Sequence, residues 1–371
     1  MSEDEIVRER NAIYIQASVN GQRTKMRLAT VESSATDIKP TLDSIGPDIE
    51  PSGFVPETEW TPYTEAEIDC ILYIRRLLGS ELVNRLPHDT LVAFVRGHAY
   101  RSNWHAVSFV CLERALQWRR DDGVDRVLAA DGVSGYDAFV GAACRREFDA
   151  LLPSGVIGHD THGHLVVLDR PFAAPCHQLM SLVDDAEFIR HMVARREVAR
   201  AALAAESVRL GKRVYKVIGV IDVSGLGLTH LTDTRFHTRM RAFFEHFSYF
   251  YPETQTCMVL INAPRLFSAF WTIARRFLHP LTASKIRVAG ASSIKATFDE
   301  LGITLDEGVF EPMGRSMRLR NPRAWIDTLA KLKEEWPMAL LTHNYLPDAD
   351  AEALERAGIR PQSEAPLVSA F

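Results

Sequence analysis

The strongest constraint in this sequence is an alternation of strand and helix patterns that begins after Gly132. Short apolar runs such as "HLVVLDR", "VYKVIGVIDV" and "TCMVLINA" are separated by longer segments with helical periodicity at 184–211 and 233–249. Strands that are connected through helices run in the same direction, and the helices cover the faces of their sheet. The pattern therefore predicts an α/β domain built on a mostly parallel mixed sheet with covering helices.

Upstream of the alternation, the pattern is helical throughout. From Thr64 to about Leu128, apolar residues recur at three- and four-residue spacing, with an interruption at Pro87. The helix that begins after Ser102 has an apolar stripe, so we expect that face to pack against something apolar. The chain is thereby divided into a tail over 1–60, a helical lobe over 61–130, the α/β domain over 131–320, and a C-terminal helix and tail over 321–371.

The first 60 residues differ in composition from the rest. They are rich in Pro, Ser, Thr and acidic residues, which predicts an acidic and largely flexible tail. Within it, residues 12–31 alternate apolar and polar around Asn20-Gly21, the dipeptide favoured in two-residue turns, which predicts a β-hairpin. The formal net charge of −5 arises in this tail. The body is neutral and gives no reason to expect nucleic acid as a partner.

Apolar runs and cysteines indicate the cellular compartment. No run approaches the roughly 20 apolar residues that a membrane-spanning helix requires, and "MSEDEIVRER" lacks the apolar core of a secretory signal. The 5 cysteines are odd in number and include no Cys-x-x-Cys pair. We expect a cytoplasmic protein, peripheral on membranes, with ordinary buried thiols.

The segment Asp222-Val-Ser-Gly225-Leu-Gly227 shares two glycines with a dinucleotide-binding loop. It follows a strand and precedes a helix, but His230 occupies the place of the third glycine and no P-loop lysine follows. We therefore favour a plain turn at the end of a strand. The chain also lacks a Gly-x-Ser-x-Gly motif and any known local signature around its cysteines. The sequence assigns no catalytic residue, and an enzyme lacks support from these motifs without being excluded by them.

The motif "HDTHGH" contains three histidines, His159, His162 and His164, that could approach a zinc ion together with Asp160. A zinc site requires three or four converging ligands, and no further ligand or adjacent general base is apparent. Asp160 and Gly163 also supply the chemistry of a polar turn. We favour a hairpin turn and expect no metal.

The helices after residue 230 contain more apolar side chains than contact with one sheet face requires. In "TRFHTRMRAFFEHFSYFY", Phe243 and Phe247 belong to a broad aromatic stripe, and in "RLFSAFWTIARRFLHPLTASKI" apolar residues occupy several faces. Such a helix either lies deep in a core or shelters an apolar ligand and touches a membrane. Periodicity alone favours the core.

The order of segments from Val214 to Gly290 resembles the CRAL-TRIO domain of yeast-type phosphatidylinositol transfer proteins. The chain has the strand "VIGVIDVSGLGL", a helix ending in "YFYPE", the strand "MVLINAP" and the helix "FSAFWTIARRFLHPLTASKIRVAG". Upstream, "LVAFVRGHAYRSNWHAVSFVCLERALQWRRDDGVDRVL" is similar to the helical N-terminal lobe of that family, so the resemblance covers roughly residues 62–320. It implies a helical lobe packed on an α/β domain whose sheet floors an apolar lipid pocket, with the helix around 266–278 as a mobile gate.

The resemblance also implies roles for particular residues. In members that bind phosphatidylinositol, a glutamate in the Tyr-Pro-Glu corner and a later threonine and lysine hold the inositol phosphate, which points to Glu253, Thr282 and Lys285. A carboxylate accepts inositol hydroxyls, whereas a lysine and a hydroxyl hold phosphate. A plain salt bridge between Glu253 and Lys285 is the alternative. The implied apolar pocket and gate consist of Phe243, Phe247, Tyr251, Phe267, Phe270, Trp271 and Phe277.

The chain departs from the family at three places. Members that also carry phosphatidylcholine bind choline phosphate with two tyrosines and a Ser/Thr pair. The corresponding positions here are Val156, Val167, Val217 and Gly219. These side chains offer no hydroxyl, which implies that the choline site is lost. In addition, His98 replaces an arginine that helps to bind inositol, and "GVFEPMG" replaces a Gly-Gly segment.

Taken with its site residues, the resemblance implies a non-enzymatic protein that sequesters a phosphoinositide precursor such as phosphatidylinositol and exchanges it with membranes. The expected ligand is this bound lipid, without a cofactor, and the expected partner is a membrane surface that is contacted transiently. Two alternatives stay open. One is a carrier of a sterol, an isoprenoid or haem. The other is a lipid-regulated adaptor that docks a protein through the tail and through the segment after Arg320.

Overall fold

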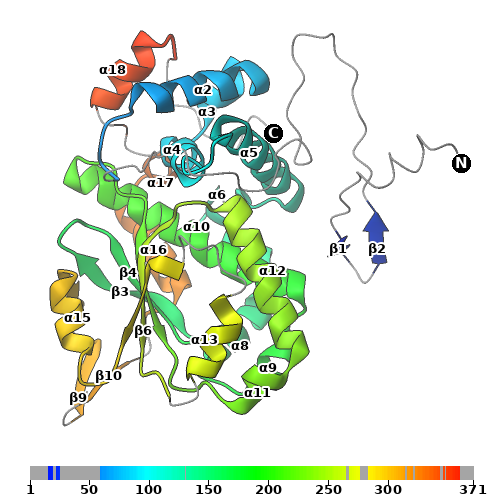
Figure 1. Ribbon diagram of the computed structural model, residues 1–371, viewed down its shortest axis with the longest axis vertical. Coiled ribbons are helices and arrows are strands. Elements are labelled where there is room, and N and C mark those ends of the chain that lie inside the picture. Colours follow the sequence, from blue (N-terminus) through cyan, green and yellow to red (C-terminus); the bar gives the residue numbers. More distant parts are fainter. Residues whose placement is uncertain are drawn as a thin grey trace, which may run out of the picture.

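The computed structural model describes residues 16–19, 22–25, 59–129, 131–264, 267–275, 283–313, 316–320, 322–342, 346 and 348–359 (Figure 1). Their helices are α2 (Glu65–Leu78), α3 (Ser80–Arg85), α4 (His88–Gly97), α5 (Trp104–Asp122), α6 (Arg126–Ala129), α7 (Ser134–Val140), α8 (Ala142–Leu151), α9 (Cys176–Leu182), α10 (Asp185–Leu210), α11 (Leu228–Thr232), α12 (Thr234–Phe250), α13 (Phe267–Ala274), α15 (Ile294–Glu300), α16 (Trp325–Glu335), α17 (Met338–Thr342) and α18 (Asp348–Arg356). Their strands are β1 (Gln16–Val19), β2 (Gln22–Lys25), β3 (Ser154–Asp160), β4 (Leu165–Asp169), β5 (Val217–Asp222), β6 (Gln255–Ile261), β7 (Ile286–Ala289), β8 (Ile303–Leu305), β9 (Phe310–Met313) and β10 (Ser316–Leu319). None of these helices combines the length and the apolar character that crossing a membrane requires.

The central sheet has the strand order β7-β6-β5-β4-β3-β8. Strands β4, β5, β6 and β7 pair in parallel, whereas β3 pairs antiparallel with both β4 and β8. The α/β class with a mostly parallel mixed sheet is therefore confirmed. The "HDTHGH" motif spans the last two residues of β3 and the turn that leads to β4, so it forms part of the hairpin that we expected.

Alternating side chains of the strands enter different apolar clusters, as the pleat of a sheet requires. Val167 and Val217 belong to a cluster with α10 and α16, whereas Val166 and Leu168 belong to a cluster with α15. Because the register places Ile221 opposite Leu260, these two residues share the α10 face of the sheet, where they pack with α12 and α13. The aromatic-rich helices thus cover the same face as the long helix α10 (Figure 1).

The helical lobe is formed mainly by α2, α4 and α5, and its core is completed by the C-terminal segment. Thr64 caps α2 in a capping box with Glu67, whose carboxylate also accepts a hydrogen bond of 2.7 Å from Arg96 Nε. Leu354 of α18 and Ile359 are buried in the same apolar cluster as the lobe helices. Part of the segment 321–371, for which we expected a C-terminal helix and tail, therefore packs against the helical lobe.

Two short strands lie within the residues of the expected hairpin in the first 60 residues. Strand β1 pairs antiparallel with β2, and Val19 lies opposite Gln22, whereas Asn20 and Gly21 lie outside the described residues. Glu59 lies within the expected tail over 1–60, yet its side chain is buried, with 5% exposed.

Candidate functional site

Two of the three residues assigned to a lipid head group lie together at one edge of the sheet, and a third charged residue joins them. The Glu253 carboxylate lies 3.1 Å from Lys285 Nζ and 2.5 Å from Lys216 Nζ. Lys285 Nζ also donates to the Gln255 carbonyl at 3.2 Å. Thr282 lies outside the described residues. The alternative salt bridge between Glu253 and Lys285 is thus present, but Lys216 shares the carboxylate.

The parallel sheet explains why these three side chains meet. Lys216 directly precedes β5, Glu253 lies two residues before β6, and Lys285 directly precedes β7. These are neighbouring parallel strands, so their amino ends lie at the same edge of the sheet. We call Lys216, Glu253 and Lys285 the charged niche. The sequence analysis missed Lys216, although aligning the starts of the predicted parallel strands would have revealed it.

The backbone of Glu253 has an unusual conformation that presents its side chain at this edge. Its φ is 52°, in the left-handed region that costs a non-glycine residue about 1–2 kcal/mol. Glycine would avoid that cost, so the position retains a carboxylate at the expense of backbone strain. Burial alone would raise the pKa of Glu253, but Lys216 and Lys285 outweigh this effect and lower the pKa. The carboxylate is therefore ionised at neutral pH.

A buried network holds Lys216 in place. Glu59 accepts a hydrogen bond of 2.7 Å from the Lys216 amide and lies 2.8 Å from His164 Nε2, while His164 Nδ1 lies 2.7 Å from Asp160. Burial lowers the pKa of His164, but the hydrogen bonds to Asp160 and Glu59 outweigh burial and raise it to about 9. His164 is therefore protonated and serves as a structural cation.

The histidine motif has structural contacts in place of converging metal ligands. Both ring nitrogens of His164 bond carboxylates, and His162 stacks on Trp60 with ring centroids 4.8 Å apart. Within the described ranges, no group of three or more His, Cys, Asp or Glu residues could hold a metal ion. The absence of bound metal stays a prediction for elemental analysis.

The residues assigned to the apolar pocket and gate separate into two regions. Phe267 and Trp271 of α13 stack with ring centroids 6.2 Å apart, and both contact the cluster that contains Phe236 and Leu260. Phe270 belongs to the same helix, but its side chain lies outside the described part of the structure, as does Phe277. In the observed position, α13 covers the α10 face of the sheet.

The other three aromatic residues line up along α12 and its end. Phe243 contacts Phe188 edge to face at 6.1 Å, and lies 4.7 Å from Phe247. Phe247 stacks on Tyr251 at 5.2 Å, and the Tyr251 hydroxyl donates to Glu197 Oε1 at 2.8 Å. Tyr251 thereby contacts a buried carboxylate of α10 that also pairs with Arg119 of the helical lobe. The seven assigned residues do not form one contiguous wall among the side chains that are described.

The four positions where the family would bind choline phosphate share the α10 face of the sheet. Val156 pairs with Val167 across β3 and β4, and Val167 pairs with Gly219 across β4 and β5. Val217 lies two residues before Gly219, so it points to the same face. A side chain at Gly219 would meet only Met258 and Gln255 at ordinary contact distances of 3.7 and 3.8 Å. Three aliphatic side chains and one glycine thus form this part of the sheet floor.

The glycine-containing turn after β5 has a structural explanation. A Cβ at Gly225 would lie 1.7 Å from the Phe172 carbonyl oxygen, which no side chain can accommodate. Gly227 has open surroundings, because its nearest neighbour, His230 Nδ1, would lie 3.9 Å away. Close approach of Gly225 to another backbone therefore accounts for this motif without a nucleotide.

His98, at the place of the family's arginine, follows the C-terminus of α4. The preceding residue, Gly97, packs so tightly on the corner that an added Cβ would lie 2.7 Å from Pro252 Cβ and 3.3 Å from Glu253 Cβ. The end of α4 in the helical lobe therefore contacts the Tyr-Pro-Glu corner at Pro252 and Glu253. His98 is 5% exposed.

Comparison with known proteins locates a family match in this region. The family model of the CRAL/TRIO domain matches residues 152–302. The chain is 29% identical over 176 residues to the phosphatidylinositol/phosphatidylcholine transfer protein SFH4 of Arabidopsis thaliana, covering 47% of this chain and 27% of that protein. It is 25% identical over 203 residues to Protein real-time of Anopheles gambiae, covering 55% of this chain and 28% of that protein. The alignments thus span less than a third of the length of either relative.

The crystal structure of Sfh5 aligns with a TM-score of 0.39 and 15% sequence identity, covering 64% of this chain and 69% of that structure. The segment matched by the family model contains strands β3 to β7 together with Lys216, Glu253 and Lys285. The match to the CRAL/TRIO domain over residues 152–302 therefore includes all three residues of the charged niche.

Proposed function

We propose that the protein binds phosphatidylinositol and transfers it between membranes, with the charged niche holding the inositol phosphate. The observation that carries the proposal is one carboxylate shared by two ammonium groups, at the amino edge of three parallel strands of a CRAL/TRIO domain. The niche has a net charge of +1. A phosphodiester head group has one negative charge and would neutralise it, while the Glu253 carboxylate accepts inositol hydroxyls.

His98 replaces the positively charged arginine of the family, and Lys216 would supply a positive charge in its place. The Lys216 side chain is 13% exposed and its ammonium group already contacts Glu253, so a phosphate entering the niche would meet two ammonium groups. Thr282 would add a hydroxyl. These contacts support a head-group site that uses lysine where other members use arginine.

The acyl chains would follow the α10 face of the sheet towards α13. Ile221 lies in β5, five residues after Lys216, and this separation corresponds to about 16 Å of extended chain. Ile221, Phe267 and Trp271 belong to one apolar cluster at the far end of the strands. In this proposal α13 is the gate, and displacement of α13 would expose the chains to a membrane surface. The protein would act as a peripheral carrier without a catalytic step.

The decisive experiment compares two lipids. The purified protein should accelerate the transfer of labelled phosphatidylinositol between vesicles but barely transfer phosphatidylcholine, because the choline positions carry no hydroxyl. Mass spectrometry of lipids extracted from the purified protein should identify phosphatidylinositol. Equal transfer of both lipids would refute the head-group selectivity, and a co-purified sterol, isoprenoid or haem would replace the proposal with another carrier function.

A further inference from the structure

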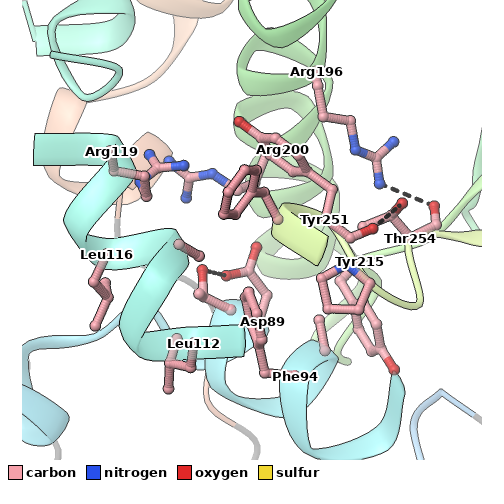
Figure 2. A pocket seen from close by; sticks show the side chains of 15 residues that line it. Asp89, Phe94, Leu112, Leu116, Arg119, Arg196, Arg200, Tyr215, Tyr251 and Thr254 are labelled. Atoms are coloured by element: carbon pink, nitrogen blue, oxygen red, sulfur yellow. Dashed lines mark hydrogen bonds between the residues drawn. The ribbon is translucent and has the colours of Figure 1, made fainter. Parts of the chain in front are cut away.

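A cavity lies between the helical lobe and the α/β domain, beside the corner that contains Glu253 (Figure 2). Its walls come from α4, α5 and α10, from Tyr215, and from the residues that follow α12. Neither Glu253 nor Lys285 lines it, so the cavity is separate from the charged niche. Most of its wall is apolar and is formed by Ala93, Phe94, Leu112, Ala115, Leu116, Phe250 and Pro252.

Three arginines line this cavity, and two of them form ion pairs with acidic residues. Glu197 bonds Arg119 at 2.9 Å and Arg200 at 3.1 Å, and Arg119 also pairs with Asp125. Arg196 donates one hydrogen bond of 2.9 Å to the Thr254 carbonyl, as Figure 2 shows, and has no ion pair within the described part of the chain.

Two further observations concern Arg196 and Arg200. Burial lowers the pKa of Arg196 to about 10, as expected for a guanidinium that has lost water without gaining a full counter-charge. Arg200 Nη1 is buried and has no hydrogen-bond partner among the described residues. Burial lowers the pKa of Arg200, but Glu197 outweighs burial and raises it, so Arg200 already has a counter-charge. Arg196 has no carboxylate partner among the described residues, so an anion bound beside it would supply the missing counter-charge.

One acid also lines the cavity. Asp89 is 8% exposed and accepts a hydrogen bond of 3.2 Å from the Thr90 hydroxyl, and the structure shows no hydrogen bond from it to the three arginines. Burial raises the pKa of Asp89. A protonated Asp89 can donate to a carboxylate, whereas an ionised Asp89 would repel a dianion more strongly than a monoanion.

We propose that this cavity binds a small carboxylate with a short aliphatic chain. The carboxylate would accept hydrogen bonds from Arg196 and from Arg200 Nη1, because a guanidinium matches the two oxygens of a carboxylate. The chain would pack against Phe94, Leu112 and Leu116. A phosphate dianion suits the cavity less well, since its remaining oxygens would face these apolar side chains.

Such a ligand would contact α4 and α5 on one side and α10 on the other. It would therefore brace the helical lobe against the α/β domain. The proposal does not depend on phosphatidylinositol transfer, because its residues differ from those of the charged niche.

The test is isothermal titration of the full chain with hexanoate, with 1-hexanol as the uncharged control ligand. Hexanoate should bind saturably and 1-hexanol at least about tenfold more weakly, since hydrogen bonds to charged groups contribute about 1.5–3 kcal/mol. Arg196→Gln should weaken hexanoate binding by at least about tenfold. The matched control Arg241→Gln, at an arginine of α12 whose side chain is 66% exposed, should bind like the parent.

Hexanoate could also enter an acyl cavity beneath α13, and the variants separate the two sites. Binding there would survive Arg196→Gln, which would overturn the proposal, as would equal binding of 1-hexanol or no binding to the parent. Lys285→Ala should lose lipid transfer and retain hexanoate binding. If Arg196→Gln unfolds, Leu116→Trp, which narrows the apolar end of the cavity, should weaken hexanoate binding instead, and unchanged binding would refute the site.

Discussion

Removing Lys285 separates a ligand-binding role from a structural one, because Lys216 stays beside Glu253. In Lys285→Ala, the Glu253 carboxylate keeps a cation at 2.5 Å and is not left buried without a counter-charge. The Lys285 side chain is 33% exposed, and partly exposed ion pairs contribute about 0.2–1 kcal/mol. The melting temperature of the lipid-stripped variant should therefore fall by less than about 4 °C.

Transfer of phosphatidylinositol should respond much more strongly. Loss of one partner from a desolvated, charge-assisted contact costs about 2–5 kcal/mol, which corresponds to a decrease of about 30-fold or more. Thr282→Ala should likewise lose transfer while its stripped form melts within a few degrees of the parent. Lys295→Ala is the control, because Lys295 lies on α15 with its side chain 72% exposed and should behave like the parent.

The assay is calorimetric unfolding of lipid-stripped protein, measured beside vesicle-to-vesicle transfer of labelled phosphatidylinositol. Lys216→Met combined with Lys285→Ala should destabilise the protein by about 3 kcal/mol, since Glu253 then has no counter-charge, and adding Glu253→Gln should recover most of that loss. Early unfolding of Lys285→Ala, together with normal transfer by Thr282→Ala, would make the niche structural and refute the head-group assignment.

Three further predictions follow from single contacts. The carboxylate partners of His164 raise its pKa to about 9, so the protonated ring stabilises the fold fully below about pH 6.5, and this stabilisation is lost as pH rises through 9. In urea unfolding, the free energy of unfolding should decrease by about 2–3 kcal/mol between pH 6 and 10, and His164→Gln should lack this decrease. Gly225→Ala should lower the free energy of unfolding by more than about 2 kcal/mol through its clash with a carbonyl, whereas Gly227→Ala should change it by less than about 1 kcal/mol. Phe270→Ser combined with Trp271→Ser should weaken sedimentation with vesicles, and unchanged sedimentation would indicate that α13 does not contact the membrane.

The sequence alone determined the class of the fold, because its signals are local. Alternating strand and helix periods predict a mostly parallel sheet, and Asn20-Gly21 predicts a tight hairpin turn. The order of segments around the Tyr-Pro-Glu corner also showed the resemblance to the CRAL/TRIO domain, whose family model matches residues 152–302. Strand period, helix period and turn type depend on the backbone conformation of residues that are close together in the sequence.

Tertiary structure decided which charges meet. Lys216 reaches Glu253 only because β5 and β6 pair in parallel in one particular register, and Glu59 reaches His164 across 105 positions of the chain. The hydrogen bond from Arg196 to the Thr254 carbonyl likewise depends on how α10 packs against the start of β6. Charged side chains pair over a few ångströms between segments distant in sequence, and periodicity does not encode such distances.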